Sequence, residues 1–155
     1  MIKEEYVNFE TAKLLKEKGF DGVCYKVWQS IKYEGQFLTC APVFVEGETT
    51  VTRETVDAAV KLRVYEYDLE DGMEEGYLAP SQSLAMRWLR EKFGIHIIIN
   101  HDSCDEYWYW QAVDVKDKDE NWDGKFALTE EYGGFSTYEE TAEKAIKYCL
   151  EELLS

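Results

Sequence analysis

The chain has few positively charged residues. Its 155 residues include 17 Lys and Arg against 32 Asp and Glu, which gives a formal net charge of −15. A surface with this charge repels nucleic-acid phosphates and anionic membranes, and it suits a very soluble protein, a partner for basic surfaces or a cation binder. We therefore expect no direct binding to nucleic acid and no membrane association.

Long apolar runs are also missing. No run approaches the length of a membrane span, and the first residues, MIKEEYVNFE, lack the apolar core of a signal peptide. The four cysteines, Cys24, Cys40, Cys104 and Cys149, are widely spaced, so no CxxC pair indicates a zinc ribbon or a thioredoxin-like site. We expect free thiols and a cytoplasmic protein.

Recognised catalytic motifs are absent as well. The sequence contains no GxSxG, no phosphate-binding glycine loop and no HExxH. Cys104 and His101 are conceivable as a nucleophile and its base, but closeness in sequence does not activate a thiol. We predict a protein that is not an enzyme, with no catalytic, cofactor-binding or metal residues and no cofactor.

The residues that are present favour one α+β domain over residues 1–155. Hydrophobic residues make up 45% of the chain and aromatic residues 15%, which is enough for a sizeable core. A subdivision is conceivable: a helix at 8–20 and strands at 23–28 and 36–45 form residues 1–45, and 46–76 form an insertion or loop. Within 46–76, the stretch RETVDAAVKL suits a helix, whereas KLRVYEYDL alternates like a strand.

Residues 77–155 show the clearest pattern, which is α-β-β-β-α. A helix starts near Pro80, strands are expected at 95–99, 107–115 and 124–132, and the last helix covers 137–153. Ser136 and Glu139 are spaced as a capping box, and Gly133-Gly134 is expected to turn the chain into the last helix. We predict an antiparallel sheet with helices packed on one face, as in double-stranded RNA-binding domains, but with glutamates where those domains place lysines.

A calcium-loop pattern lies in DENWDGKFALTE, residues 119–130. Asp119, Asn121, Asp123, Gly124 and Glu130 have the spacing of a helix–loop–helix calcium site. The flanking sequence is strand-like, and Asp-Gly is a strong hairpin signal, so we predict a turn at Asp123-Gly124 between two strands. Weak calcium binding at these carboxylates stays open.

A second metal candidate is HDSCD, which holds His101, Asp102, Cys104 and Asp105. These are zinc-ligand types, but a structural site needs a fourth ligand, and His96 is the only other histidine. Strand turns are commonly rich in Asp and Ser, which favours a plain turn here. Metal binding by His101 and Cys104 is left open.

The run Tyr107-Trp108-Tyr109-Trp110 places aromatic side chains on both faces of one strand. One pair is expected under the helices. The other pair is expected to be covered by residues 1–45, or else by a second copy or a partner protein.

Three segments carry a family resemblance: FETAKLLKEKGFD, YLAPSQSLAMRWLRE and YEETAEKAIKYCLEELL. In this order they resemble a family of small acidic proteins from gut-bacterial genomes and their phages or prophages. The resemblance covers about residues 5–25 and 77–155, and 46–76 departs from it. The family has no established activity, so the resemblance implies a phage-associated, cytoplasmic protein and transfers no site residues.

These observations lead to one function hypothesis and three alternatives. We predict a non-catalytic protein-interaction or accessory protein of phage or prophage type, with a protein partner or a second copy of itself. The first alternative is an acidic nucleic-acid mimic that inhibits a DNA- or RNA-binding protein. A divalent-cation binder and a small hydrolase using His101 or His96 are the remaining alternatives.

Overall fold

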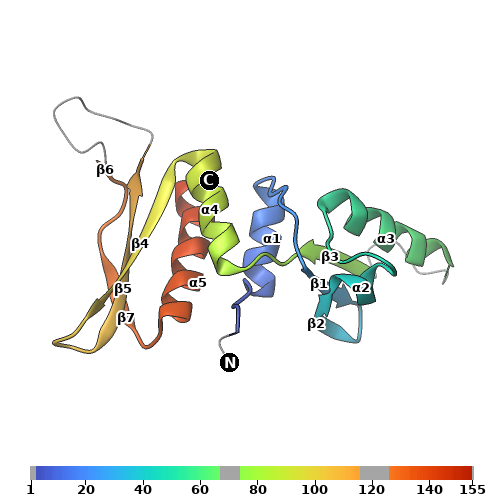
Figure 1. Ribbon diagram of the computed structural model, residues 1–155, viewed down its shortest axis with the longest axis horizontal. Coiled ribbons are helices and arrows are strands. Elements are labelled where there is room, and N and C mark those ends of the chain that lie inside the picture. Colours follow the sequence, from blue (N-terminus) through green and yellow to red (C-terminus); the bar gives the residue numbers. More distant parts are fainter. Residues whose placement is uncertain (1–2, 67–73, 116–125, 155) are drawn as a thin grey trace. The chain divides into compact units, whose positions relative to one another are not determined.

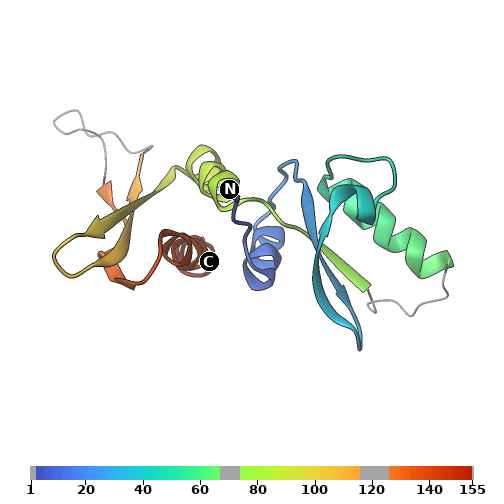
Figure 2. The same ribbon diagram turned by 60° about the horizontal axis from the view of Figure 1, so that its bottom comes forward.

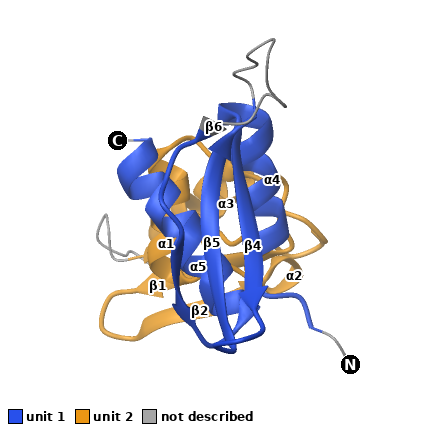
Figure 3. Ribbon diagram, turned by 90° about the vertical axis from the view of Figure 1, so that its left-hand side faces the viewer, with its two compact units in different colours: residues 1–5, 82–155 blue, residues 6–81 orange. Residues whose placement is uncertain are grey.

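The computed structural model describes residues 3–66, 74–115 and 126–154. The chain divides into two compact units (Figure 3). Unit 1 consists of Met1–Glu5 and Gln82–Ser155, and unit 2 of Tyr6–Ser81. Both units combine helices with an antiparallel sheet, so the predicted α+β class is confirmed. The boundary after Ser81 lies a few residues beyond the one considered from the sequence.

Unit 2 is a three-stranded antiparallel sheet with helices on both faces (Figure 1, Figure 2). Its described elements are α1 (Phe9–Glu17), β1 (Lys26–Ile31), β2 (Gly35–Cys40), α2 (Ala41–Phe44), α3 (Arg53–Glu66) and β3 (Glu74–Leu78). The strand order is β2-β1-β3. On one face, Phe9 of α1 meets the rings of Trp28 and Tyr77 edge-on at 6.2 and 5.4 Å. On the other face, α3 packs against β3.

The close approach of α3 to the sheet depends on Gly76. A Cβ atom at this position would lie 2.6 Å from Cγ1 of Val56 and 3.2 Å from the ring of Phe44. Val56 is fully buried in this layer. Any larger residue at position 76 would therefore push α2 and α3 away from β3.

The first helix agrees with its prediction. Asn8 is the N-cap, and its side-chain oxygen accepts a hydrogen bond of 2.9 Å from the Thr11 N–H. The helix ends before Gly19, which has a φ of +83°, a conformation that glycine adopts without strain.

Two predictions for unit 2 were wrong. The strand expected at 36–45 ends at Cys40, and residues 41–44 form α2, because Pro42 in the first turn suits a helix start. The loop or insertion expected at 46–76 contains all of α3 and the beginning of β3, and the helix considered for RETVDAAVKL is confirmed as part of α3. The strand-like alternation after Lys61 is helical through Glu66, since α3 is held by its packing on the sheet.

Unit 1 has the predicted α-β-β-β-α order. Its described elements are α4 (Gln82–Phe93), β4 (Ile95–Asp102), β5 (Tyr107–Asp114), β6 (Phe126–Ala127), β7 (Tyr132–Phe135) and α5 (Tyr138–Tyr148), which continues as the π-helical turn η1 (Cys149–Leu153). β4 pairs with one edge of β5, and the short strands β6 and β7 both pair with the other edge. α4 and α5 pack against each other and cover one face of this sheet (Figure 1).

The core of unit 1 lies between these helices and the sheet. Leu89 of α4, Ile146 of α5 and Leu150 of η1 are fully buried there, and Trp110 of β5 is 2% exposed. The last helix therefore carries a buried apolar stripe from Ala142 to Leu150. Tyr138, at the start of this helix, is 40% exposed.

Details at the ends of the unit 1 elements differ from the predictions. The helix expected to start at Pro80 starts at Gln82, and the Pro80 carbonyl instead accepts a hydrogen bond from the Val7 N–H. The predicted third strand is split into β6 and β7. Gly133-Gly134, expected as a turn, belongs to β7, where Gly133 lies against Tyr107.

The cap of the last helix is shifted by one residue. Thr137, not Ser136, is the N-cap, and its hydroxyl accepts a 3.1 Å hydrogen bond from the Glu140 N–H. The Glu140 side chain in turn accepts a hydrogen bond from the Ser136 N–H at 3.3 Å. The predicted capping box of Ser136 and Glu139 is therefore wrong: Thr137 caps the helix, and Glu140 accepts from the residue before the cap.

Candidate functional site

A groove of about 630 Å³ lies between α2 and α3 of unit 2. We call it the α2–α3 groove. Its apolar lining consists of Val43, Phe44, Val45, Ala58, Ala59 and Leu62. Its polar lining consists of Glu46, Thr55, Arg63 and Glu66. A cavity of this size is within the range that proteins use for ligands and for anchoring side chains of partners.

Side chains on both sides of the groove are unusually open to solvent. Val43 of α2 is 78% exposed, and Leu62 of α3 is 56% exposed. Next to Leu62 along α3, Tyr65 is 85% exposed. Solvent exposure of large apolar side chains costs free energy, so a cluster of them commonly marks a binding surface.

Helix α3 has two apolar faces, which explains this exposure. Val56 is buried against the sheet, as expected for one face of an amphipathic helix. Ala58, Leu62 and Tyr65 recur at spacings of four and three residues, so they share a second face, and all three are exposed. The helix therefore carries an apolar stripe that no described residue covers.

Exposed apolar side chains are concentrated in unit 2. Among the described residues of that unit they are Val23, Tyr25, Tyr33, Phe37, Leu38, Val43, Leu62 and Tyr65. Among the described residues of unit 1 they are Leu128 and Tyr138. Of the two units, unit 2 thus exposes more large apolar side chains within the described ranges.

A polar network holds the floor of the groove in place. The Arg63 guanidinium pairs with Glu74 of β3 at 2.7 Å, and it also donates to the carbonyl of Phe44 in α2. It lies 4.1 Å from the centre of the Phe44 ring. Glu74 is only 5% exposed, and Gln29 of β1 donates a second hydrogen bond to it at 2.8 Å. Arg63 thus connects both walls of the groove to the sheet.

The free charge of the groove is negative. The positive charge of Arg63 is matched by the buried Glu74 carboxylate. Glu46 and Glu66 line the groove and are exposed. The arrangement can hold an apolar side chain whose neighbours are cationic.

The calcium candidate falls largely outside the described residues. Asp119, Asn121, Asp123 and Gly124 lie in 116–125, so the predicted turn at Asp123-Gly124 stays a prediction. The two flanks are described, and they are strands: Val113 of β5 pairs with Ala127 of β6. The strands predicted on either side are therefore present. Glu130 is exposed beyond β6.

Of the HDSCD residues, His101 and Asp102 end β4, and Ser103, Cys104 and Asp105 begin the turn to β5. One side-chain oxygen of Asp102 accepts hydrogen bonds from the N–H groups of Asp105 and Cys104, at 3.1 and 2.9 Å. These bonds, that of Asp105 first, hold the pKa of Asp102 below its usual value. The ring of His101 lies 4.8 Å from that of Trp108. Among the residues that the structure describes, no three His, Cys, Asp or Glu side chains are grouped as metal ligands.

The four cysteines are free thiols. Cys24 and Cys149 are buried, and burial raises the pKa of each thiol to about 12. They are protonated at neutral pH and are therefore poor nucleophiles. Cys40 and Cys104 are exposed.

The aromatic run of β5 is divided between the two faces of its sheet, as predicted. Trp108 and Trp110 face the helices, where Trp108 meets Tyr138 of α5 edge-on at 5.6 Å. Tyr107 and Tyr109 are on the other face, where a Cβ atom on Gly133 would lie 2.7 Å from the Tyr107 ring. β7 thus contacts these tyrosines, and the cover expected from residues 1–45 stays a prediction.

The groove residues were not singled out from the sequence. Val43 was assigned to a strand, and Leu62 lies where helix and strand patterns overlap. One signal was available: Val56 and Val60 repeat at helical spacing beside Ala58, Leu62 and Tyr65, so a helix here has two apolar faces. This pattern in the sequence does not show which of the two faces packs on the sheet and is buried.

Comparisons with known protein families, with curated proteins and with solved structures give no match for this chain. Within the described ranges, no helix combines the length and the apolar character that crossing a membrane requires. Function is therefore inferred from the chain's own residues.

Proposed function

We propose that this chain is a non-catalytic interaction or accessory protein, and that its α2–α3 groove binds a basic, amphipathic helix of a protein partner. One observation carries the proposal: Val43 and Leu62 are exposed on the two walls of a groove that also has exposed glutamates. The steps below give the reasons for an apolar contact, for a basic partner and for a helix.

Val43 and Leu62 supply the apolar contact. Burying a side chain of this kind contributes about 1.5–3 kcal/mol relative to leaving it in water. Both side chains project from helices whose other faces are packed on unit 2, with Phe44 and Val56 buried beside them. The groove is therefore held in shape before a partner arrives, which lowers the entropy cost of binding.

The charge of the chain indicates a basic partner. Glu46 and Glu66 line the groove, and the whole chain carries −15. Lysine or arginine beside the apolar residues of the partner would be attracted to these carboxylates and would speed association. A second copy of the chain would bring another −15, so repulsion disfavours the homodimer.

A helix is the partner structure that fits best. Ala58, Leu62 and Tyr65 cover two turns of α3, about 10 Å along its axis. A partner helix that lies along this stripe can place its own apolar residues at matching i, i+4 and i+7 positions. The same positions would be too widely spaced for a single side chain or a small molecule to cover.

Designed peptides test this proposal. One peptide is an amphipathic helix with leucines on one face and lysines beside them, and its companion has glutamates in place of the lysines. We expect the lysine peptide to bind in a fluorescence-anisotropy titration and the glutamate peptide not to bind. Equal binding of the two peptides, or a dimeric chain in sedimentation equilibrium, would contradict the proposal.

Matched variants separate the groove from general charge attraction. Val43→Ser and Leu62→Ser are expected to weaken binding of the lysine peptide about tenfold each, because each removes an apolar contact of more than 1.4 kcal/mol. Val23→Ser is the control, since Val23 is also an exposed valine of unit 2, at 52%, but does not line the groove. If Val43→Ser and Val23→Ser bind alike, the groove is not the binding site.

A phage or prophage origin and a cytoplasmic location are part of the same proposal. The resemblance of three sequence segments supports them, and those segments lie in α1, across β3 and α4, and in α5 with η1. The four free thiols agree with a reducing compartment. We expect phage genes beside the gene for this chain, and a setting of metabolic genes alone would count against this origin.

A further inference from the structure

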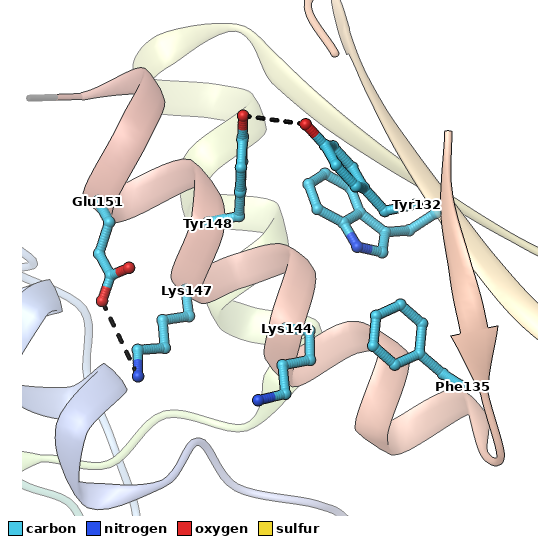
Figure 4. Close-up of a pocket in the computed structure, with 7 residues that line it drawn as sticks. Tyr132, Phe135, Lys144, Lys147, Tyr148 and Glu151 are labelled. Atoms are coloured by element: carbon cyan, nitrogen blue, oxygen red, sulfur yellow. Dashed lines mark hydrogen bonds and ion pairs between the residues drawn. The ribbon is translucent and has the colours of Figure 1, made fainter. Parts of the chain in front are cut away.

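A second hollow lies in unit 1, between α5 and β7 (Figure 4). We call it the α5–β7 pocket. Its volume is about 300 Å³, at the lower end of the range for small-molecule sites. Its aromatic lining comes from Trp110 of β5, Tyr132 and Phe135 of β7, and Tyr148 of α5.

Three of these aromatic side chains, Trp110, Tyr132 and Tyr148, fix one another. The rings of Trp110 and Tyr132 are stacked, with centres 5.0 Å apart and planes at 29°. Tyr148 lies 5.1 Å from Tyr132 and 5.3 Å from Trp110, and the Tyr132 hydroxyl donates to the Tyr148 hydroxyl at 3.2 Å. The pocket therefore has rigid aromatic walls, against which a planar ring can stack or pack edge-on.

Two lysines complete the lining. Lys144 and Lys147 are three residues apart on α5 and both line the pocket, with their side chains directed away from the Tyr132–Tyr148 pair (Figure 4). Lys147 has an ion pair of 3.9 Å with Glu151, which also lines the pocket. Lys144 is exposed and has no ion pair with any residue that the structure describes.

The α5–β7 pocket has more basic than acidic residues in its lining, in contrast to the chain as a whole. The chain carries 32 acidic and 17 basic residues, yet two lysines and one glutamate line this pocket. An aromatic cage alone would suit a cationic ligand, but the two ammonium groups repel one. An anionic group is attracted instead, and Lys144 is available to pair with it.

We propose that the α5–β7 pocket binds a small planar aromatic molecule that carries a carboxylate or a phosphate. Its ring lies beside Phe135 and Tyr148, and its anionic group pairs with Lys144. Lys147 adds positive charge, partly offset by Glu151. This site is independent of the α2–α3 groove, because it is formed by unit 1 alone.

Four naphthalene compounds with the same ring and different charge test the proposal: 2-naphthoate, 2-naphthyl phosphate, 2-naphthalenemethanol and 2-naphthylmethylammonium. Their binding to the full chain is followed by two-dimensional NMR of the labelled protein. We expect both anions to bind at least tenfold more tightly than the alcohol and to shift the Trp110 indole N–H signal. The ammonium compound is expected not to bind. The tighter of the two anions identifies the natural charged group as carboxylate or phosphate.

Two lysine variants with the same loss of charge provide the control. Lys144→Gln is expected to weaken binding of the anions about tenfold and to leave binding of the alcohol unchanged. Lys92→Gln removes a lysine of α4 that does not line the pocket, and it should leave all four affinities unchanged. Equal affinity for anion and alcohol, tighter binding of the ammonium compound, or equal effects of the two variants would overturn the proposal.

Discussion

Glu74 is a buried carboxylate that connects β3 to α3 and β1 in unit 2. It is 5% exposed, it pairs with Arg63 at 2.7 Å, and it accepts a hydrogen bond from Gln29. A buried ion pair gives little net stability compared with an apolar pair, but loss of one partner leaves the other charge without compensation. Arg63 also supports both walls of the α2–α3 groove through its contacts with Phe44.

Glu74→Gln is therefore expected to lower the free energy of unfolding by about 3 kcal/mol. Urea unfolding followed by circular dichroism measures the change. Glu48→Gln is the control, because Glu48 is exposed in a loop of the same unit. If the two variants are equally stable, the buried pair does not hold α3 on the sheet.

Asp102 makes stability depend on pH at a single turn. Its folded-state pKa is lowered, first by the hydrogen bond from the Asp105 N–H and then by that from Cys104. The ionised form of Asp102 is therefore favoured in the folded protein. Its contribution to the free energy of unfolding is complete above the ordinary aspartate pKa of about 3.9, and it is lost as pH falls through the lower pKa of the folded state.

The variant Asp102→Asn isolates this contribution, because the substitution removes the negative charge while the amide oxygen can still accept the hydrogen bonds. We expect the wild type to be more stable than the variant at pH 7, and the difference to shrink toward zero in strong acid. Urea unfolding at a series of pH values measures it. A difference that stays constant from pH 7 to pH 2 would show that the charge of Asp102 has no part in the turn.

At the scale of single elements, the N-terminus of α5 depends on which neighbouring hydroxyl residue caps the helix. Thr137 accepts the 3.1 Å hydrogen bond from Glu140, while Ser136 contributes its backbone N–H alone. We expect Thr137→Ala to lower the free energy of unfolding by about 1 kcal/mol and Ser136→Ala to have little effect. Thermal unfolding of both variants measures this. A larger loss of stability in Ser136→Ala than in Thr137→Ala would show that Ser136 is the cap.

Elements with local signals were predictable from sequence. α1 has its cap at Asn8 and its stop at Gly19, and α5 with η1 has an apolar stripe that ends in buried Leu150. Strands β4 and β5 have strong strand composition over eight residues each. The features of β4, β5 and α5 predicted most of the α-β-β-β-α order of unit 1, because each depends on residues near in sequence.

Elements that depend on distant residues were not predictable in this way. β3 contains Glu74 and Gly76, which are residue types typical of a loop. The strand forms because the Arg63 guanidinium neutralises Glu74 and because Val56 occupies the space beside Gly76. The same holds for the α2–α3 groove, since α3 has two apolar faces and the sheet decides which one is buried. The α5–β7 pocket combines residues from one helix and two strands.

At the scale of the whole molecule, the two units offer different chemistry for recognition. In unit 2, exposed apolar side chains lie beside free carboxylates in the α2–α3 groove. In unit 1, aromatic walls lie beside two lysines in the α5–β7 pocket. The strong negative charge of the chain favours a basic macromolecular partner, and the local positive charge of the pocket favours a small anion.

The most direct test of the central claim is to locate the bound lysine peptide on the labelled chain by NMR. We predict that the amide signals that shift during the titration lie around the α2–α3 groove, at Val43, Ala58 and Leu62 above all, and that a spin label on the peptide broadens the same signals. Shifts spread evenly over the acidic surface, or confined to unit 1, would contradict the claim that this groove is where the protein binds its partner.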